Sequence, residues 1–161
     1  ELQHLRNYMF IQCEKNNDRI RVIYDIDEKI FPYRILKLSL QPIAENSIIH
    51  AFKNTRNDNI IAIDGSLINN KIRIRITDNG VGMDQKAIDR LLNDVDEEEE
   101  KEEAKQNNNN HTGIGMGNVN RRLKLTFGEE YGLKVISEVL KGTTVEVWLP
   151  TQMQCDNKNI P

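Results

Sequence analysis

Cysteine is scarce in this sequence, since Cys13 and Cys155 are the only two among 161 residues. Their separation matches neither a disulfide framework nor the ligand spacing of a zinc site, so a reduced, cytosolic setting is expected. Long hydrophobic runs are also missing, because no stretch approaches the roughly 20 apolar residues of a membrane-spanning helix. The sequence shows no signal peptide and begins at Glu1 rather than Met. We therefore expect a fragment whose membrane or sensory parts lie upstream.

A strong excess of charge of either sign is missing too. The formal net charge is −3, which offers no basic surface to neutralise the phosphates of a nucleic acid. A nucleic acid is therefore not expected as a partner. Hydrophobic residues make up 38% of the chain and charged residues 29%, which is the balance of a soluble globular protein. The length suits one domain with a single core.

What is present is a mixture of two hydrophobic periodicities. Apolar residues at helical spacing predict four helices, over residues 2–15, 34–52, 84–92 and 118–127. Alternating apolar and polar residues predict five strands, over residues 20–26, 60–63, 72–76, 133–139 and 143–149. Pro42 is expected to kink or restart the second helix. This order predicts an α+β fold, a two-layer sandwich in which helices cover one face of a mixed sheet.

Two segments are too polar to join a core. Residues 94–106 are mostly acidic, with eight acidic side chains between Asp94 and Glu103, and residues 107–110 are all asparagine. Such a composition cannot bury enough apolar surface to order itself. We predict a solvated, mobile segment there, with a partner-binding tail as the alternative. Residues 151–161 are also polar and are expected to fray.

The segment Asp78-Asn79-Gly80-Val81-Gly82 closes a predicted strand and precedes a predicted helix. A carboxylate at a strand end can accept a hydrogen bond from an exocyclic amine such as adenine N6. Glycines at alternate positions allow the backbone to approach a ligand closely. Asp-Asn-Gly is also a common turn sequence. The segment alone therefore leaves a turn and a nucleotide site open.

Three glycines, Gly113, Gly115 and Gly117, precede the predicted helix at 118–127. Backbone N–H groups and the helix dipole at such a start can cradle a phosphate. The segment is not a Rossmann fingerprint, because its third glycine comes one residue early and no strand precedes it. It is not a Walker A loop either, because no Gly-Lys-Ser/Thr follows. A flexible hinge is the alternative.

Polar residues also lie on the second predicted helix. Asn46 and His50 are four residues apart and therefore share one side of that helix, with Glu45 beside them. A side-chain amide oxygen is a hard ligand suited to Mg²⁺, which is usually held by few protein groups together with phosphates. The alternative is that Asn46 and His50 are ordinary polar residues at the edge of the apolar stripe.

In their order along the chain these segments resemble the ATP-binding catalytic domain of bacterial sensor histidine kinases. Residues 40–50, Leu-Gln-Pro-Ile-Ala-Glu-Asn-Ser-Ile-Ile-His, are similar to the N box of that family. Residues 78–83 are similar to its first glycine box and residues 113–117 to its second, while Gly142-Thr143 is similar to its final Gly-Thr pair. Gln41-Pro42 and residues 118–123 resemble the LytS/YesM-like branch. The resemblance covers residues 8–150.

The resemblance implies the Bergerat-type ATP fold that is shared with Hsp90, gyrase and MutL. It implies that Asp78 reads the adenine with support from Thr143, and that the second glycine box wraps the triphosphate. Residues 94–111 become an ATP lid that opens for nucleotide exchange. The nucleotide-binding positions carried over are Asp78, Gly80, Gly82, Gly113, Gly115, Gly117, Asn118 and Thr143.

The resemblance assigns catalytic roles to the N box. Asn46 would hold Mg²⁺ against the phosphates, His50 would lie near them, and Glu45 would orient or accept the proton of the acceptor histidine. The reaction implied is transfer of the ATP γ-phosphoryl group to a histidine on an upstream helix, for relay to a response regulator. His4 lies in a sequence that does not match the acceptor motif. The acceptor is therefore expected outside the chain.

The domain limits follow from the same comparison. Residues 1–16 would be the end of the upstream helical region that carries the acceptor, residues 17–150 the ATP-binding domain, and residues 151–161 a polar tail. The complete protein would be a homodimeric, membrane-anchored sensor with this domain on the cytoplasmic side. Two other functions remain open: a degenerate nucleotide-binding or dimerisation module, and a gyrase- or Hsp90-like ATPase. Pro42 opposes the ATPase, because those relatives have a catalytic Glu at that position.

Three positions depart from the family pattern. Ile49 stands where the branch usually has Lys, Ala51 follows the histidine where Gly is usual, and Leu140 replaces a Gly near the final Gly-Thr pair. A Lys at position 49 would supply a cation close to the phosphates. Ile49 falls opposite the apolar stripe of its helix and is therefore expected at the surface.

Overall fold

The computed structural model describes residues 1–15, 19–52, 59–92 and 114–151, without the side chains of His50 and Ile114. A five-stranded sheet with the order β1-β2-β3-β5-β4 forms the base of the molecule. Its strands are β1 (Ile20–Ile26), β2 (Asn59–Ile68), β3 (Lys71–Asp78), β4 (Gly132–Glu138) and β5 (Gly142–Pro150). β1 runs parallel to β2, and the other neighbouring strands pair in antiparallel fashion. The sheet is mixed, as predicted.

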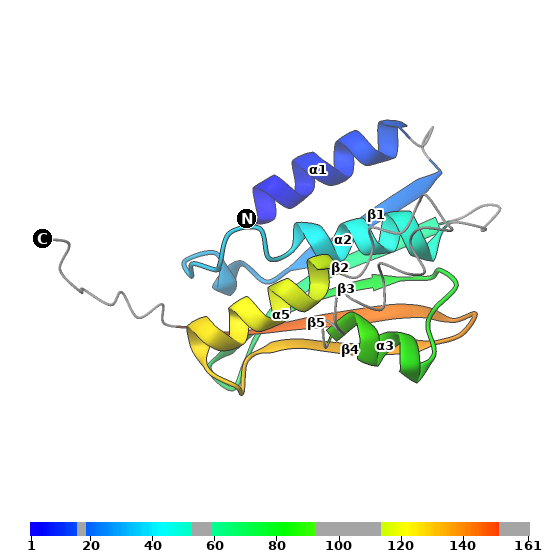
Figure 1. Ribbon diagram of the computed structural model, residues 1–161. Coiled ribbons are helices and arrows are strands. Elements are labelled where there is room, and N and C mark those ends of the chain that lie inside the picture. The colour runs from blue at the N-terminus through cyan, green and yellow to red at the C-terminus, as the bar shows by residue number, and fades with distance from the viewer. Residues whose placement is uncertain (16–18, 53–58, 93–113, 152–161) are drawn as a thin grey trace, which may run out of the picture.

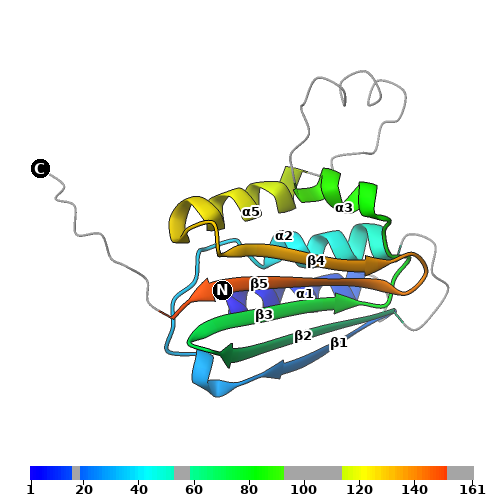
Figure 2. The same cartoon turned by 90° about the horizontal axis from the view of Figure 1, so that it is seen from below.

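Helices cover one face of this sheet (Figures 1 and 2). The α-helices are α1 (Leu2–Lys15), α2 (Gln41–Asn46), α3 (Gln85–Leu92) and α5 (Ile114–Phe127). The 3₁₀ helix η1 spans Glu28–Ile30, and the π-helix η2 spans Ser47–Ala51 and continues α2 directly. The predicted α+β sandwich is therefore confirmed.

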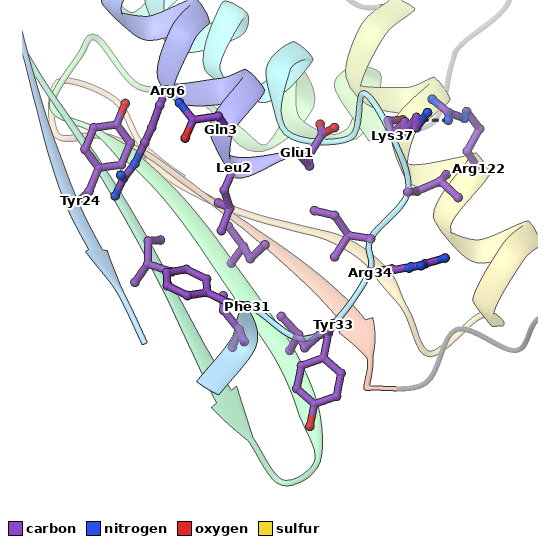
Figure 3. A pocket seen from close by; sticks show the side chains of 16 residues that line it. Glu1, Leu2, Gln3, Arg6, Tyr24, Phe31, Tyr33, Arg34, Lys37 and Arg122 are labelled. Atoms are coloured by element: carbon purple, nitrogen blue, oxygen red, sulfur yellow. Dashed lines mark hydrogen bonds between the residues drawn. The ribbon is translucent and has the colours of Figure 1, made fainter. Parts of the chain in front are cut away.

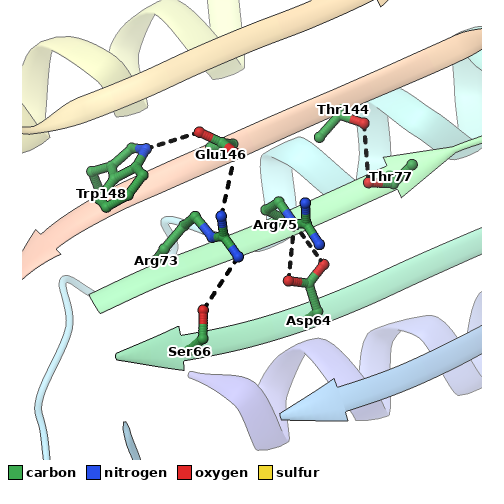
Figure 4. A network of polar contacts seen from close by, with 8 residues as sticks. All are labelled: Asp64, Ser66, Arg73, Arg75, Thr77, Thr144, Glu146 and Trp148. Atoms are coloured by element: carbon green, nitrogen blue, oxygen red, sulfur yellow. Dashed lines mark hydrogen bonds and ion pairs between the residues drawn. The ribbon is translucent and has the colours of Figure 1, made fainter. Parts of the chain in front are cut away.

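Alternation along the strands separates a core face from an outer face. On β3, Ile72, Ile74 and Ile76 are buried beneath the helices. Their neighbours on the outer face form polar contacts: the Arg75 Nε donates to both carboxylate oxygens of Asp64 at 2.9 Å (Figure 4). Period-two alternation on the central strand therefore gives the sheet one covered and one polar face.

The predicted helix over 34–52 differs from the structure in its first part. Helix α2 begins only at Gln41, with Pro42 in its first turn. Proline lacks a backbone N–H and fixes φ near −65°, which suits a helix start and prevents a helix from running through it. Residues 34–40 consequently approach α2 as irregular chain. The last turn widens into η2, a conformation that helical periodicity does not reveal.

Helix α1 packs on the same core as the rest of the chain. Leu5 and Met9 are each 1% exposed, and α1 contacts both α2 and β1. The assignment of residues 1–16 to an upstream region, and the other domain limits, stay predictions. In the part of the chain that the structure describes, no helix combines the length and the apolar character needed to cross a membrane.

Candidate nucleotide site

The Asp78 side chain lies buried where β3 ends, and only 4% of the residue is exposed. Its Oδ1 accepts hydrogen bonds from the backbone N–H groups of Gly80 at 3.0 Å and Thr143 at 3.2 Å. Its Oδ2 accepts one from the Ser47 hydroxyl at 2.9 Å. A carboxylate has about four acceptor positions. Three donors from three segments therefore orient this carboxylate and leave acceptor capacity on Oδ2.

Burial raises the pKa of the Asp78 carboxyl above its ordinary value, and the hydrogen bonds from Gly80, Ser47 and Thr143 lower it in part. Desolvation disfavours the charged form, while donors aimed at the carboxylate favour it. The net direction is upward. The fold thus holds the Asp78 carboxyl group where burial disfavours its ionised form. Groups with pKa values perturbed in this way are common at functional sites.

The register between β3 and β5 brings Thr143 to Asp78, because these residues pair directly across the two strands. Thr143 is 5% exposed, and its hydroxyl is 2.8 Å from the Ser137 hydroxyl on β4. Gly142 has φ +99°, and a Cβ there would lie 2.1 Å from the Asp78 carbonyl oxygen. Glycine at this position therefore permits the close approach of the two strands.

The first glycine box joins the N box to the β4–β5 turn. A Cβ on Gly80 would lie 2.3 Å from Ala51 Cβ. Gly82 has φ +65°, and a Cβ there would collide with the Glu138 carbonyl group. Val81 donates its N–H to the Ala51 carbonyl at 3.0 Å and accepts from the Leu140 N–H at 2.7 Å. Both glycines are thus required by the close packing of this segment against Ala51 and Glu138.

The N box presents its polar residues at the end of α2. Glu45 and Asn46 occupy the last turn and are half-buried, and Glu45 Oε1 accepts from the Gln41 amide at 2.9 Å. Asn46 directly precedes Ser47, which contacts Asp78. The backbone of His50 belongs to η2, while its side chain lies outside the described part. Its role at the phosphates stays a prediction.

The second glycine box lies partly inside a helix. Helix α5 begins at Ile114, so Gly115 and Gly117 belong to its first turn rather than to a preceding loop. Gly115 is exposed and close to α2, since a Cβ there would lie 3.4 Å from Pro42 Cβ. Asn118 accepts a hydrogen bond from the Arg121 guanidinium at 3.1 Å. Gly113 and the predicted lid at 94–111 lie outside the described residues.

Two serines at this site were not predicted from the sequence. Ser47, which is 3% exposed, appeared there only as one residue of the N box and was given no role. Ser137 accepts from the Met83 N–H at 2.8 Å and donates to the Gly142 carbonyl at 2.9 Å. A hydroxyl on a buried helix face needs a hydrogen-bond partner. That requirement was the available signal for Ser47, whereas Ser137 gave none.

A cavity of about 910 Å³ lies elsewhere, between α1, β1, β3 and residues 30–37 (Figure 3). Its wall includes Tyr24, Phe31 and Ile72. Ile72 lies at the start of β3, the opposite end of that strand from Asp78. None of the predicted site residues lines this cavity. Its location therefore separates it from the nucleotide site predicted around Asp78.

A metal ion would find few protein ligands here. Within the described ranges, no group of three or more His, Cys, Asp or Glu side chains is arranged to hold one. Mg²⁺ in nucleotide sites is commonly held by one or two protein oxygens together with phosphate oxygens and water. Glu45 and Asn46, adjacent on the last turn of α2, offer such oxygens. The donor set fits a phosphate-bound Mg²⁺ and not a protein-caged metal.

Residues 35–153 match the family described as histidine kinase-, DNA gyrase B-, and HSP90-like ATPase. The chain is 33% identical to the sensor histidine kinase YesM of Bacillus subtilis over 150 residues, which are 93% of this chain and 23% of that protein. It is also 33% identical to the sensor histidine kinase YpdA of Escherichia coli over 152 residues, 94% of this chain and 24% of that protein. The chain thus spans about a quarter of the length of these relatives.

Solved structures share the fold at lower identity. The histidine kinase domain of the blue-light activated histidine kinase from Erythrobacter litoralis EL346 matches with a TM-score of 0.57 and 18% identity, over 92% of this chain and 60% of that one. The Acinetobacter baumannii histidine kinase AdeS matches with a TM-score of 0.60 and 10% identity, over 94% of this chain and 63% of that one.

The family match covers most of the chain, and the chain therefore belongs to the family of histidine kinase-, DNA gyrase B- and HSP90-like ATPases. Two relatives at 33% identity bear the name sensor histidine kinase. The chain accordingly has the ATP-binding domain of this family, in the form that such sensor kinases share.

Proposed function

We propose that the chain transfers the γ-phosphoryl group of ATP to a histidine outside it, from which a response regulator receives the group. The observation that carries this proposal is the Asp78 carboxylate, which is oriented by Gly80, Ser47 and Thr143 beside the N box. A buried acceptor at a strand end suits the amine of adenine. The last turn of α2 then supplies the groups for the phosphates.

The individual roles in this proposal follow the chemistry of the side chains. Asn46 would hold Mg²⁺ through its amide oxygen, and Mg²⁺ supplies charge neutralisation on the phosphates. Glu45 would orient or accept the proton of the attacking imidazole. The N–H groups at the start of α5, where Gly115 and Gly117 lie, would face the triphosphate.

We further propose that the complete protein is a homodimeric, membrane-anchored sensor with this domain on the cytoplasmic side. The support comes from the relatives named as sensor histidine kinases, since this chain corresponds to about a quarter of the length of each. The gyrase- or Hsp90-like ATPase is disfavoured by Pro42, which occupies the first turn of α2 and has no group to activate water. A degenerate nucleotide-binding module is the outcome that the experiment must exclude.

The test is transfer of labelled phosphate from Mg·ATP. The domain alone should remain unlabelled, because the sequence around His4 does not resemble the acceptor motif. Addition of a fragment with the acceptor helix should produce labelled fragment, and Asn46→Ala should abolish the label through loss of Mg²⁺. ATP binding without any transfer to the acceptor would establish the degenerate module. Labelling of His4 would show that the domain boundary is misplaced.

A further inference from the structure

The cavity between α1, β1, β3 and residues 30–37 has the size and the wall of a ligand site (Figure 3). Its volume of about 910 Å³ falls within the range of roughly 300–1,000 Å³ that small molecules occupy in proteins. Most of the 16 residues that line it are aliphatic or aromatic. Ile72 and Ile74, which reach it from β3, are each 1% exposed. The part of the wall that β3 contributes is therefore apolar and shielded from water.

Positively charged side chains surround the entrance of this cavity. Its wall includes four cationic residues, Arg6, Arg34, Lys37 and Arg122, and all four are exposed. Within the described part of the chain, no carboxylate forms an ion pair with any of them. The whole chain has a formal net charge of −3. The positive charge at the entrance is therefore a local feature that runs against the charge of the chain.

Among the described residues that line the cavity, only Glu1 is acidic. Its carboxylate accepts hydrogen bonds from the backbone N–H groups of Leu38 and Ser39, each at 3.0 Å, and of Leu40 at 3.2 Å. Three donors fill most of the acceptor positions of a carboxylate. Glu1 thus binds the backbone beside the cavity, and the cations at the entrance remain available to an anion from solution.

The irregular segment 34–40 forms one side of the entrance and is held in place by other elements. The Arg122 Nη2 donates a hydrogen bond from α5 to the Lys37 carbonyl at 3.1 Å. Leu38 has φ +57°, a conformation that a residue with a side chain keeps only where the surrounding structure holds it. A wall that is fixed in this way forms the cavity before a ligand arrives, which lowers the cost of binding.

Phe31 also lines the cavity, although 57% of the residue is exposed. It follows directly after η1, and its N–H group donates to the Glu28 carbonyl at 3.1 Å. The backbone thus holds a large aromatic ring at the cavity without burying it. An apolar group bound in the cavity would cover this ring and remove its surface from water, which is favourable.

We propose that this cavity binds an amphipathic organic anion, namely a fatty acid. Its acyl chain would lie against the apolar wall, and its carboxylate would meet the cations at the entrance. Guanidinium groups suit such a head group, because their N–H donors bind both oxygens of a carboxylate. The proposal goes beyond phosphoryl transfer and does not depend on it, since the ligand binds without nucleotide and away from Asp78.

The experiment is a calorimetric titration of the full 161-residue chain with laurate, below the concentration at which laurate forms micelles. Dodecyltrimethylammonium has the same chain with the opposite charge, and acetate has the same head group without the chain. We expect laurate to bind at one site and the other two compounds not to bind. Absence of laurate binding would overturn the proposal. Equal binding of laurate and dodecyltrimethylammonium would overturn it as well, because the cations would then have no role.

The apolar wall is tested by Phe31→Ser, with Phe10→Ser as the matched control. Phe10 is 68% exposed on α1 and lies outside the wall of the cavity. We expect Phe31→Ser to weaken laurate binding about tenfold, because apolar contact area is lost, and Phe10→Ser to bind like wild type. Both side chains are exposed, so both variants should fold, as thermal unfolding can verify. Equal affinities of these two variants for laurate would remove the cavity from the proposal.

The entrance is tested by Arg34→Gln, with Arg90→Gln on α3 as its control, since both arginines are exposed. Arg34→Gln should weaken laurate binding about tenfold and reduce its salt dependence, whereas Arg90→Gln should change neither. Sedimentation with phosphatidylglycerol vesicles distinguishes a free fatty acid from a membrane surface. We expect the chain to stay in solution. Sedimentation with the vesicles, lost in Arg34→Gln and without laurate binding, would show a membrane-docking surface and overturn the proposal.

Discussion

Replacement of Asp78 by asparagine separates recognition of adenine from stability of the fold. In Asp78→Asn, the amide oxygen can take the place of Oδ1 and accept from the Gly80 and Thr143 N–H groups. The amide nitrogen then takes the place of Oδ2, and the Ser47 hydroxyl, now 2.9 Å away from Oδ2, can rotate to accept from it. The local network therefore survives the substitution. The position that faces the adenine amine changes from an acceptor to a donor.

The expected loss in ATP binding follows from that reversal. An unpaired buried donor costs about 1–3 kcal/mol, which raises the dissociation constant for ATP roughly 5- to 150-fold. Calorimetry with Mg·ATP measures this loss directly. Asp64→Asn is the matched control, because it removes the same charge on the outer face, where Asp64 pairs with Arg75. Equal affinity of the wild-type domain for ATP and GTP would refute the adenine assignment of Asp78.

The same substitution gives a pH-dependent stability difference of known sign. Because burial raises the pKa of Asp78 in the folded state, the contribution of this group to stability is present below the unfolded value of 3.8. It is lost as the pH rises through the raised folded value. At neutral pH, Asp78→Asn should therefore unfold at the same or a higher temperature than wild type. That difference should disappear as the pH falls towards 3.8. A variant that is less stable than wild type at neutral pH and equally stable in acid would contradict this account.

Three further substitutions are informative. Ile49→Lys should fold normally, because Ile49 is 53% exposed, and should tighten ATP binding by about 1–2 kcal/mol with a steeper salt dependence; a drop in melting temperature without a gain in affinity would contradict it. Gly82→Ala should lower the melting temperature more than Gly128→Ala, because both glycines have positive φ but only Gly82 lacks space for a Cβ; similar losses in thermal scans would remove the steric argument. Leu140→Gly should raise the melting temperature by about 2–4 °C per kcal/mol of relieved strain, because Leu140 is 83% exposed at φ +66° and gains little from its side chain; an unchanged or lower value would show that this strain is negligible.

Periodicity predicted the elements of the fold well because most of them bury one face. Ile72, Ile74 and Ile76 alternate on β3, and the α+β sandwich follows from such patterns with the helical ones. The irregular conformation of residues 34–40 was harder to predict from the sequence. Their apolar residues have helical spacing, but the start of α2 at Gln41 is set by Pro42 and by hydrogen bonds that the Ser39 and Leu40 N–H groups donate to the distant Glu1 carboxylate. Local patterns carry no information about a partner so far away along the chain.

The candidate site was predictable where its residues are motif residues and not where they act through backbone. Asp78 lies at the end of a strand, as expected, and Thr143 lies beside it. Thr143, however, reaches Asp78 through its N–H group, which any residue except proline provides. The contact of Ser47 with Asp78 depends on how the helical segment packs against β3, so no spacing rule reveals it. The alignment of β3 with β5, by contrast, follows from both strands having one buried face.

That alignment has a consequence for variation in chain length. The residues between α3 and α5 join two helices that contact each other on the same face, and the described residues on either side, 85–92 and 114–127, hold no strand of the sheet. A gain or loss of residues between 93 and 113 therefore leaves the pairing of Asp78 with Thr143 untouched. One added residue within β3 or β5 would instead turn every following side chain to the opposite face. Homologues and engineered variants should thus tolerate large changes in length at the first place and none at the second.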